Sequence, residues 1–183
     1  MKLGGIEIGD LNEVPPVDVI DMKEVYAFFG LAAFNAQVLE KGLVNFAMAY
    51  RLLEDDILTR EYWLINYESI NSNTFGSLLK KVKRHVDIPK IVLEYLHKSL
   101  EKRNWLAHNF FSDRSMHMSD EDGMLVMIEE LRELVSLFHI TDKLLDTVYM
   151  NVWAKFGVDD DWIKNAIQES LKEYQQNKER ITQ

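Results

Sequence analysis

The fold class is decided by residues 21–53, DMKEVYAFFGLAAFNAQVLEKGLVNFAMAYRLL, a stretch whose apolar residues recur every three or four positions. These residues are Val25, Phe28, Phe29, Ala32, Ala36, Leu39, Leu43, Phe46, Ala47, Tyr50 and Leu53. Such spacing is typical of an amphipathic helix with one buried face. Asp21 and Glu24 form a capping-box pattern, so we expect the helix to begin near residue 21 and to run to about residue 56.

The rest of the chain repeats this helical period. We expect helices at roughly 21–56, 59–70, 74–86, 89–111, 119–156 and 160–175, with starts marked by Thr74, Pro89, Ser119 and Asp159. Residues 112–118 predict a loop, Gly157 predicts a helix end, and only residues 4–9 could form a strand. The sequence therefore predicts an all-α bundle of five to six helices, two of them long. We expect one domain over residues 1–183, with 1–20 as an N-terminal extension and 176–183 as a frayed tail.

Composition excludes several classes of protein. The 183 residues are 47% hydrophobic and 28% charged, with 3 Pro and 8 Gly, which rules out disordered and low-complexity chains. The absence of Cys excludes disulfides, thiolate zinc sites and a Cys nucleophile. The longest nearly apolar run, residues 25–34, is too short to cross a bilayer, and the N-terminus lacks the apolar segment of a signal peptide. We therefore expect a cytoplasmic protein with no membrane partner.

Charge is distributed unevenly along the chain. The net charge is −9, yet residues 74–108 carry eight cations and three anions, so this basic segment is +5 and the remainder is −14. Such an asymmetry steers an anionic ligand to one region of an acidic protein. The alternative interpretation is that the lysines only solvate the surfaces of two helices.

The sequence lacks metal and cofactor motifs. Glu94 and His97 form a single Glu-x-x-His pair, whereas a di-iron bundle needs two such pairs and two further glutamates. The chain has no Gly-x-x-x-x-Gly-Lys-Ser/Thr phosphate loop, no Gly-x-Gly-x-x-Gly and no Gly-x-Ser-x-Gly. We therefore expect neither a metal nor a cofactor, and no nucleotide-binding α/β fold.

The residues best suited to chemistry lie at 102–111, KRNWLAHNFF, inside the basic segment. This run resembles the signature of the HEPN superfamily (higher eukaryotes and prokaryotes nucleotide-binding domain), in which an Arg is followed after four to six residues by a His. Arg103, Asn104, Ala107 and His108 are similar to the Arg-Asn-x-x-Ala-His-x-Tyr pattern of HEPN toxins that are paired with nucleotidyltransferase antitoxins. Phe110 departs from the pattern, because its ring has no hydroxyl group to accept a nucleotidyl group.

The resemblance extends over residues 21–152 and implies a function. It implies a dimeric, metal-independent ribonuclease of toxin–antitoxin or phage-defence systems, with Arg103, Asn104 and His108 as the catalytic residues. RNA, a second copy of the chain and a cognate antitoxin protein are the implied partners. We expect RNA to be bound by the neighbouring cations Lys80, Lys81, Lys83, Arg84, Lys98 and Lys102.

These residue types suit RNA cleavage without a metal. The 2′-hydroxyl group attacks the adjacent phosphate, which requires a base, an acid and a positive charge. His titrates near neutral pH and can serve in either proton transfer, Arg binds phosphate oxygens through two N–H groups, and Asn can orient the His or the phosphate. One His cannot easily act as base and acid in the same step. We therefore expect a two-fold dimer that brings together the ends of both 89–111 helices, with the two basic stretches flanking a shared cleft.

The spacing within the motif sets a condition on the structure. Five positions of a straight helix turn about 500°, so Arg103 and His108 would point about 140° apart. They converge only if the helix ends or bends between them, or if a second chain completes the site. A second match, Arg132 and His139, has six intervening residues and lacks the Asn. We interpret this second pair as two side chains on one helical face.

Two non-catalytic hypotheses stay open. The chain could be a HEPN-like binding or scaffold module that dimerises and recognises a nucleotide, an RNA or a protein. It could also be a structural dimer without RNA, in which Arg103 and His108 only stabilise a helix end, since clustered polar groups also serve structure.

Overall fold

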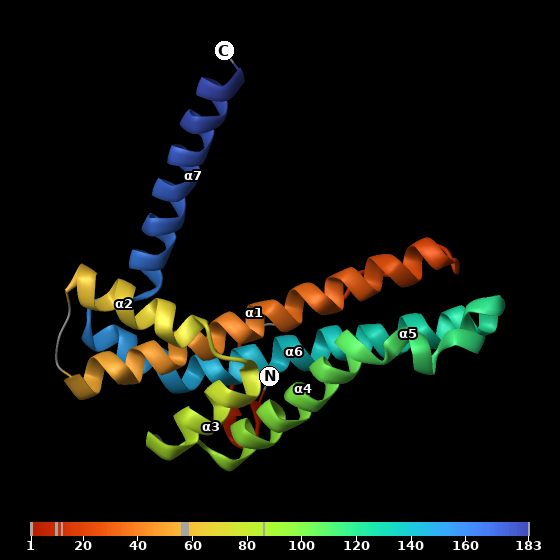
Figure 1. Cartoon of the computed structure of the whole chain (residues 1–183), viewed down its shortest axis with the longest axis horizontal. Helices are drawn as coiled ribbons and strands as arrows, with labels where there is room; N and C mark the ends of the chain where they lie inside the picture. Colours follow the sequence, from red (N-terminus) through yellow and green to blue (C-terminus); the bar gives the residue numbers. More distant parts are fainter. Residues whose placement is uncertain (1, 10, 12, 56–58, 86, 183) are drawn as a thin grey trace.

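The computed structural model describes residues 2–9, 11, 13–55, 59–85 and 87–182, and it consists almost entirely of helices (Figure 1). The helices are α1 (Met22–Asp55), α2 (Arg60–Asn71), α3 (Phe75–His85), α4 (Lys90–His108), α5 (Phe110–Asp113), the 3₁₀ helix η1 (Ser115–Ser119), α6 (Glu121–Lys155) and α7 (Asp160–Thr182). Within the described residues, the strands are β1 (Lys2–Leu3) and β2 (Ile6–Glu7), which form a short antiparallel hairpin. The predicted all-α fold is confirmed.

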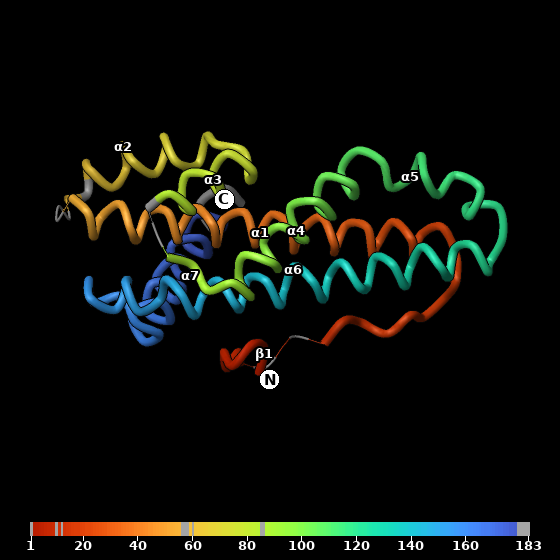
Figure 2. The backbone as a smooth tube through the Cα atoms, turned by 90° about the horizontal axis from the view of Figure 1, so that it is seen from below, coloured from red at the N-terminus to blue at the C-terminus, as the bar shows by residue number. Residues whose placement is uncertain are grey.

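The two long helices, α1 and α6, run side by side in the same direction and form the axis of the bundle (Figures 1 and 2). The Phe46 and Tyr149 ring centroids lie 6.1 Å apart across this pair. A Cβ atom at Gly42 would lie 2.6 Å from Asp142 Oδ1, so the glycine allows α6 to approach α1 closely. Most of the predicted apolar stripe of α1 is buried, although Leu53 is 40% exposed and Leu52 is buried in its place.

Helix α4 packs against this pair in the opposite direction. Ser99 Oγ and Thr141 Oγ1 share a 2.8 Å hydrogen bond between α4 and α6, with both residues fully buried. Because a buried hydroxyl is costly without a partner, this bond fixes the register of α4 on α6. The shorter helices α2 and α3 pack against α1.

Side-chain caps begin several of the helices where polar residues precede them. The capping oxygens and the backbone N–H groups that donate to them are Asp21 Oδ1 with Glu24, Thr59 Oγ1 with Tyr62, Thr74 Oγ1 with Ser77, Asp120 Oδ1 with Gly123, and Asp159 Oδ1 with Trp162. Asp120 therefore caps α6, one residue after the predicted Ser119. Gly157 follows α6 with φ +77°, a left-handed conformation that favours glycine.

The structure differs from the predicted helix boundaries most clearly in the following places. α4 ends at His108 rather than at residue 111, because Asn109 leaves the helical conformation (φ −126°, ψ −17°) and α5 begins at Phe110. Residues 112–118, predicted to be a loop, belong mostly to the end of α5 and to η1. The tail predicted to fray from residue 176 is helical as far as Thr182, because its Gln, Lys, Glu and Arg residues have good helix propensity.

The described residues before α1 lie along the bundle rather than away from it (Figure 2). Ile8 is 1% exposed and joins the core, and a Cβ atom at Gly4 would lie 3.0 Å from the Ile91 side chain of α4. Among the described residues, no helix combines the length and the hydropathy that crossing a bilayer requires.

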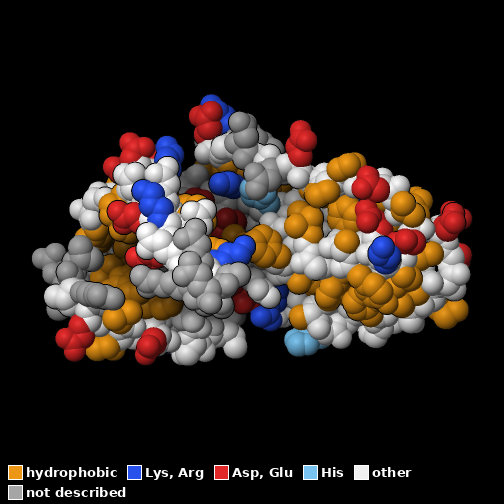
Figure 3. Space-filling view, turned by 90° about the horizontal axis from the view of Figure 1, so that it is seen from above, with side chains coloured by type: hydrophobic (Ala, Val, Ile, Leu, Met, Phe, Trp, Pro, Cys, Tyr) orange, Lys and Arg blue, Asp and Glu red, His pale blue; other side chains and the backbone are white. Residues whose placement is uncertain are grey.

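An apolar patch remains exposed on the N-terminal half of α1. Its members are Tyr26, Phe34 and Val38, which are 53%, 60% and 38% exposed and follow one another at helical spacing. Figure 3 shows apolar side chains gathered over this part of the molecule, on the right-hand half of the view. We call these three residues the α1 patch.

Candidate functional site

Arg103 projects from α4 towards α1. Its Nε atom lies 2.6 Å from Glu40 Oε1 in an ion pair, and the two side chains are 34% and 28% exposed. Its Nη1 group donates a 3.2 Å hydrogen bond to Asn104 Oδ1. Arg103 is therefore held between a carboxylate of α1 and the Asn that follows it in the motif.

His108 lies on a different side of the same helix. It is exposed, and α4 is continuous from Arg103 to His108, so the two side chains diverge by about 140° at 100° per residue. Asn104 precedes His108 by four residues and shares its helical face. Within one chain, Arg103 contacts Asn104, and Asn104 lies on the same helical face as His108. Arg103 and His108 do not lie together.

A cavity of about 730 Å³ separates the start of α3 from α4. Four of its nitrogen-bearing side chains come from the basic segment: Lys80, Lys83, His97 and Arg103. Asn104 also lines it, and Lys83 Nζ lies 3.3 Å from His97 Nε2. Residues 74–77 at the beginning of α3 form another wall, where the first backbone N–H groups of a helix favour negative charge. The α3–α4 cavity is therefore suited to an anion.

The other predicted RNA-binding cations lie elsewhere. Lys98 and Lys102 line a separate cavity of about 320 Å³ between α4 and α6. Lys81 lines a third hollow, between α1, α2 and α3, and Arg84 is exposed on α3. The six predicted cations therefore spread over several faces, and only Lys80 and Lys83 share a cavity with the motif.

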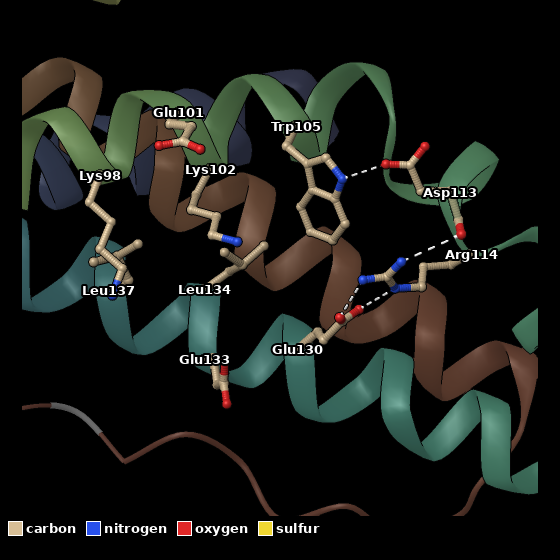
Figure 4. A pocket seen from close by; sticks show the side chains of 10 residues that line it. All are labelled: Lys98, Glu101, Lys102, Trp105, Asp113, Arg114, Glu130, Glu133, Leu134 and Leu137. Carbon is tan, nitrogen blue, oxygen red and sulfur yellow. Dashed lines mark hydrogen bonds and ion pairs between the residues drawn. The ribbon is translucent and has the colours of Figure 1, made fainter.

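The α4–α6 cavity contains a clasp that the sequence analysis missed (Figure 4). Arg114 Nε and Nη2 donate to the two carboxylate oxygens of Glu130 at 2.7 and 2.5 Å, and this hydrogen bonding raises the pKa of Arg114. The Arg114 guanidinium lies 5.4 Å from the Trp105 ring centroid, and Trp105 Nε1 donates to Asp113 Oδ2 at 2.8 Å. This clasp fixes the chain after His108 to α4 and α6. Its partners are up to 16 residues apart in sequence, so no local spacing revealed it.

Phe110, at the position of the family Tyr, belongs to the core. It is 1% exposed, and its ring lies 5.8, 5.3 and 5.1 Å from the rings of Phe29, Trp105 and Phe111. An aromatic ring in these surroundings anchors the end of α4. Phe110, which replaces the Tyr of the family pattern, is therefore a core residue just beyond His108 and does not lie on the surface.

The second Arg–His match lies beside two half-buried acids on α6, Asp142 and Asp146. Burial raises the pKa of Asp142 to about 6, with Asp146 acting in the same direction. Burial also raises the pKa of Asp146, although the hydrogen bond that Tyr149 donates to it at 2.6 Å opposes the shift. Burial lowers the pKa of His139, helped by the positive charge of Lys143. Because Asp142 faces Gly42 across the contact between α1 and α6, this group belongs to the interior of the bundle.

Metal-binding groups and related proteins give no further assignment. Across the described part of the chain, no three His, Asp or Glu side chains cluster in a way that could hold a metal ion. No known family model, curated protein or solved structure matches this chain.

Proposed function

We propose that this chain is a metal-independent endoribonuclease of the HEPN type, acting in the cytoplasm as a toxin or phage-defence effector. The observation that carries the proposal is that Arg103 and Asn104 line the same cavity as Lys80, Lys83 and His97. A motif that had only a structural role would not need a cationic cavity beside it. RNA supplies the phosphate groups that such a cavity attracts.

The proposed reaction uses the substrate's own nucleophile. The 2′-oxygen attacks the adjacent phosphorus, the bond from phosphorus to the 5′-oxygen breaks, and a 2′,3′-cyclic phosphate and a 5′-hydroxyl end result. Arg103 stabilises the charge on the phosphate, His108 transfers a proton, and Asn104 orients Arg103. The step from substrate to product balances without an external water, metal or cofactor.

The geometry of α4 supports a site that is shared between two chains. Arg103 and His108 diverge on one helix, and each chain offers one motif His for two proton transfers. The exposed α1 patch lies at the same end of the bundle, since the Tyr26 ring is 5.8 Å from that of Phe111, just beyond His108. A second copy seated on this patch would bury apolar surface and bring two motifs together.

Glu40 has a defined place in this proposal. Its ion pair with Arg103 holds the guanidinium at the wall of the cavity while RNA is absent. An RNA phosphate would then compete with the carboxylate for the same cation. We expect Glu40 to orient Arg103 in the free protein and to weaken RNA binding by this competition.

A second candidate function is a non-catalytic bundle that dimerises and recognises a nucleotide, an RNA or a protein partner such as a cognate antitoxin. The observation that favours it is the same Arg103–Glu40 pair, because an Arg already paired across two helices can serve the fold alone. This module would keep the cavity and the dimer but would leave RNA intact.

RNA incubated with the purified protein in EDTA separates these functions. The enzyme would release fragments with 2′,3′-cyclic phosphate ends, and Arg103→Ala and His108→Ala would stop the release. Arg132→Ala and His139→Ala are matched controls that remove the same residue types from α6. Intact RNA over a broad panel of sequences and structures would instead support the binding module.

A further inference from the structure

Helix α7 leaves the bundle and projects from the end where α6 finishes (Figure 1). It nevertheless carries large apolar side chains that remain exposed: Trp162 at 54%, Ile167 at 55%, Leu171 at 54% and Tyr174 at 66%. Ile167, Leu171 and Tyr174 share one helical face, and exposed apolar residues that gather in this way commonly mark an interaction surface. A helix that lies away from its own core cannot bury them within the same chain.

One face of α7, which we call the α7 stripe, carries Ile163, Ala166, Ile167, the small polar Ser170, Leu171 and Tyr174. Trp162 lies on another side of the helix. The gaps between these positions are three, one, three, one and three residues, so the series is the same in both directions. Two such helices placed antiparallel would therefore match along their whole stripes. The symmetry permits pairing between two copies, and the opposite charges near the two ends of the helix favour it.

We infer that the α7 stripe is a docking surface for α7 of a second copy of this chain, packed antiparallel about a two-fold axis. In this arrangement, Ile163 shares a level with Tyr174 of the second copy, Ala166 with Leu171, and Ile167 with Ser170. Two of these three levels combine a large with a small side chain, which allows the helices to approach closely.

Charge supports the antiparallel direction. Asp160, in the first turn of α7, comes within one residue of the level of Lys178 of the second copy. A parallel pair would instead set the two acidic first turns, with Asp160 and Asp161 in each, beside one another. Antiparallel helices also place their opposite dipole ends together.

A groove at the base of α7 extends the same surface. This cavity of about 580 Å³ is lined mainly by aromatic and apolar residues of α1, α2, α6 and α7, among them Trp63, Trp153 and Ile163. Because Ile163 shares a level with Tyr174 of the second copy, the C-terminal half of that helix would pass along this groove. Pairing would therefore cover both the stripe and the groove.

The proposed α7 pair is independent of the proposed ribonuclease site. α7 projects from the end of the bundle where α1 and α6 finish, whereas His108 ends α4 near their beginnings (Figure 1). Loss of the α7 pair would lower the mass of the particle and keep RNA cleavage, because the α1 patch would still join two chains. Loss of the motif would abolish cleavage at an unchanged mass, so failure of either proposal can be recognised without the other.

Light scattering on the full chain tests the surface. We expect Ile167→Glu with Leu171→Glu to lower the particle mass at least twofold, with unchanged helical content because both residues lie outside the core. Asn165→Glu with Gln168→Glu adds the same charge on the other side of α7 and should keep the wild-type mass. A wild-type particle of 21.5 kDa at the highest soluble concentration, or an unchanged mass in the stripe variant, would overturn the inference.

Introduced cysteines test the direction of pairing, since the chain has none of its own. Ser170→Cys lies near the middle of the stripe and should form an intermolecular disulfide on mild oxidation. Lys178→Cys should not, because antiparallel pairing separates its two copies by about 28 Å at 1.5 Å per residue. Efficient crosslinking through Lys178→Cys, or none through Ser170→Cys, would contradict the antiparallel pair.

Discussion

The chain carries the Arg–His pattern twice, and the two pairs have different surroundings. Arg103 reaches from α4 to Glu40 of α1 at 2.6 Å and lines a cationic cavity. Arg132 instead pairs with Glu129 at 2.9 Å, one turn earlier on its own helix. The first pair thus joins two helices beside open space, whereas the Arg of the second pair is bound within α6.

The two histidines also differ in their exposure to solvent. His108 ends its helix and is exposed, so a substrate could reach it. His139 lies in the middle of α6, half-buried near Asp146 and Lys143, and burial lowers its pKa. The same two residue types at similar spacing can therefore have different roles. The candidate site is identified by the surroundings of the pair and not by its spacing.

Alanine substitutions in the two pairs give the largest expected contrast. Arg103→Ala and His108→Ala should each reduce RNA cleavage by about 10²–10⁴-fold, the usual range for loss of a proton-transfer or charge-stabilising group. Arg132→Ala and His139→Ala should leave the cleavage rate within a few-fold. Initial rates on one labelled RNA measure all four, with circular dichroism as the check on folding. Equal losses from both pairs would remove the distinction between them.

The acids beside the second pair make a prediction about stability. Because burial raises the pKa of Asp142 from 3.8 to about 6, its charge opposes folding above pH 6, and that cost disappears as pH falls towards 4. Asp142→Asn should therefore stabilise the protein by about 2–3 kcal/mol at pH 7 and by little at pH 4. Denaturant unfolding at both pH values measures this, with exposed Asp122→Asn as the control. A loss of stability at pH 7 would contradict the role assigned to burial.

Asn104 gives a smaller expected effect within the first pair. Its side chain accepts a hydrogen bond from Arg103 Nη1, at 3.2 Å. Asn104→Ala should slow cleavage by about tenfold, the loss expected for one hydrogen bond to a charged group. Asn151→Ala on α6 is the matched control and should have no effect on the rate. A reduction in the cleavage rate as great as that of His108→Ala would instead indicate that Asn104 contacts the reacting atoms.

Lysines on the two sides of α4 give the smallest effect. Lys80→Ala with Lys83→Ala should weaken RNA binding and reduce the slope of log affinity against log salt by about 0.7 for each phosphate that is no longer neutralised. The sequence predicted that Lys98 and Lys102 also bind RNA, but they line the α4–α6 cavity rather than the one beside Arg103. Lys98→Ala with Lys102→Ala removes the same charge and should therefore reduce the slope less. Binding titrations at several salt concentrations compare the two. The reverse result would place RNA on the other face of α4.

The fold was largely predictable because helical periodicity is a local property of the sequence. The 21–53 pattern predicted α1 to within a residue or two, and the caps at Asp21, Thr74 and Asp159 were correct. The break at Asn109 was missed, since it depends on Phe110 entering an aromatic cluster that includes Phe29. The position of this helix break is therefore decided by packing between distant segments and not by local helix propensity.

The candidate site was predictable only in part. The angle of 100° per residue predicted that His108 would diverge from Arg103, and the continuous helix α4 has that geometry. The hydrogen bond from Arg103 to Asn104 was not predicted. The sequence could not reveal Glu40 or Glu130 as partners, because each lies on another helix and far along the chain. The sequence also could not show that Lys80 and Lys83 line one cavity and Lys98 and Lys102 another. That division depends on how α4 packs against α3 and α6.

Mixing wild-type and His108→Ala chains tests most directly the central claim, that one chain carries half of a shared ribonuclease site. After the two are unfolded together and refolded, a mixed dimer has one intact His108, whereas the shared cleft needs two for its two proton transfers. The account predicts that RNA cleavage in EDTA falls with the square of the wild-type fraction, so an equal mixture should keep about a quarter of the wild-type rate. A fall in simple proportion to the wild-type fraction, to about half of that rate, would contradict it.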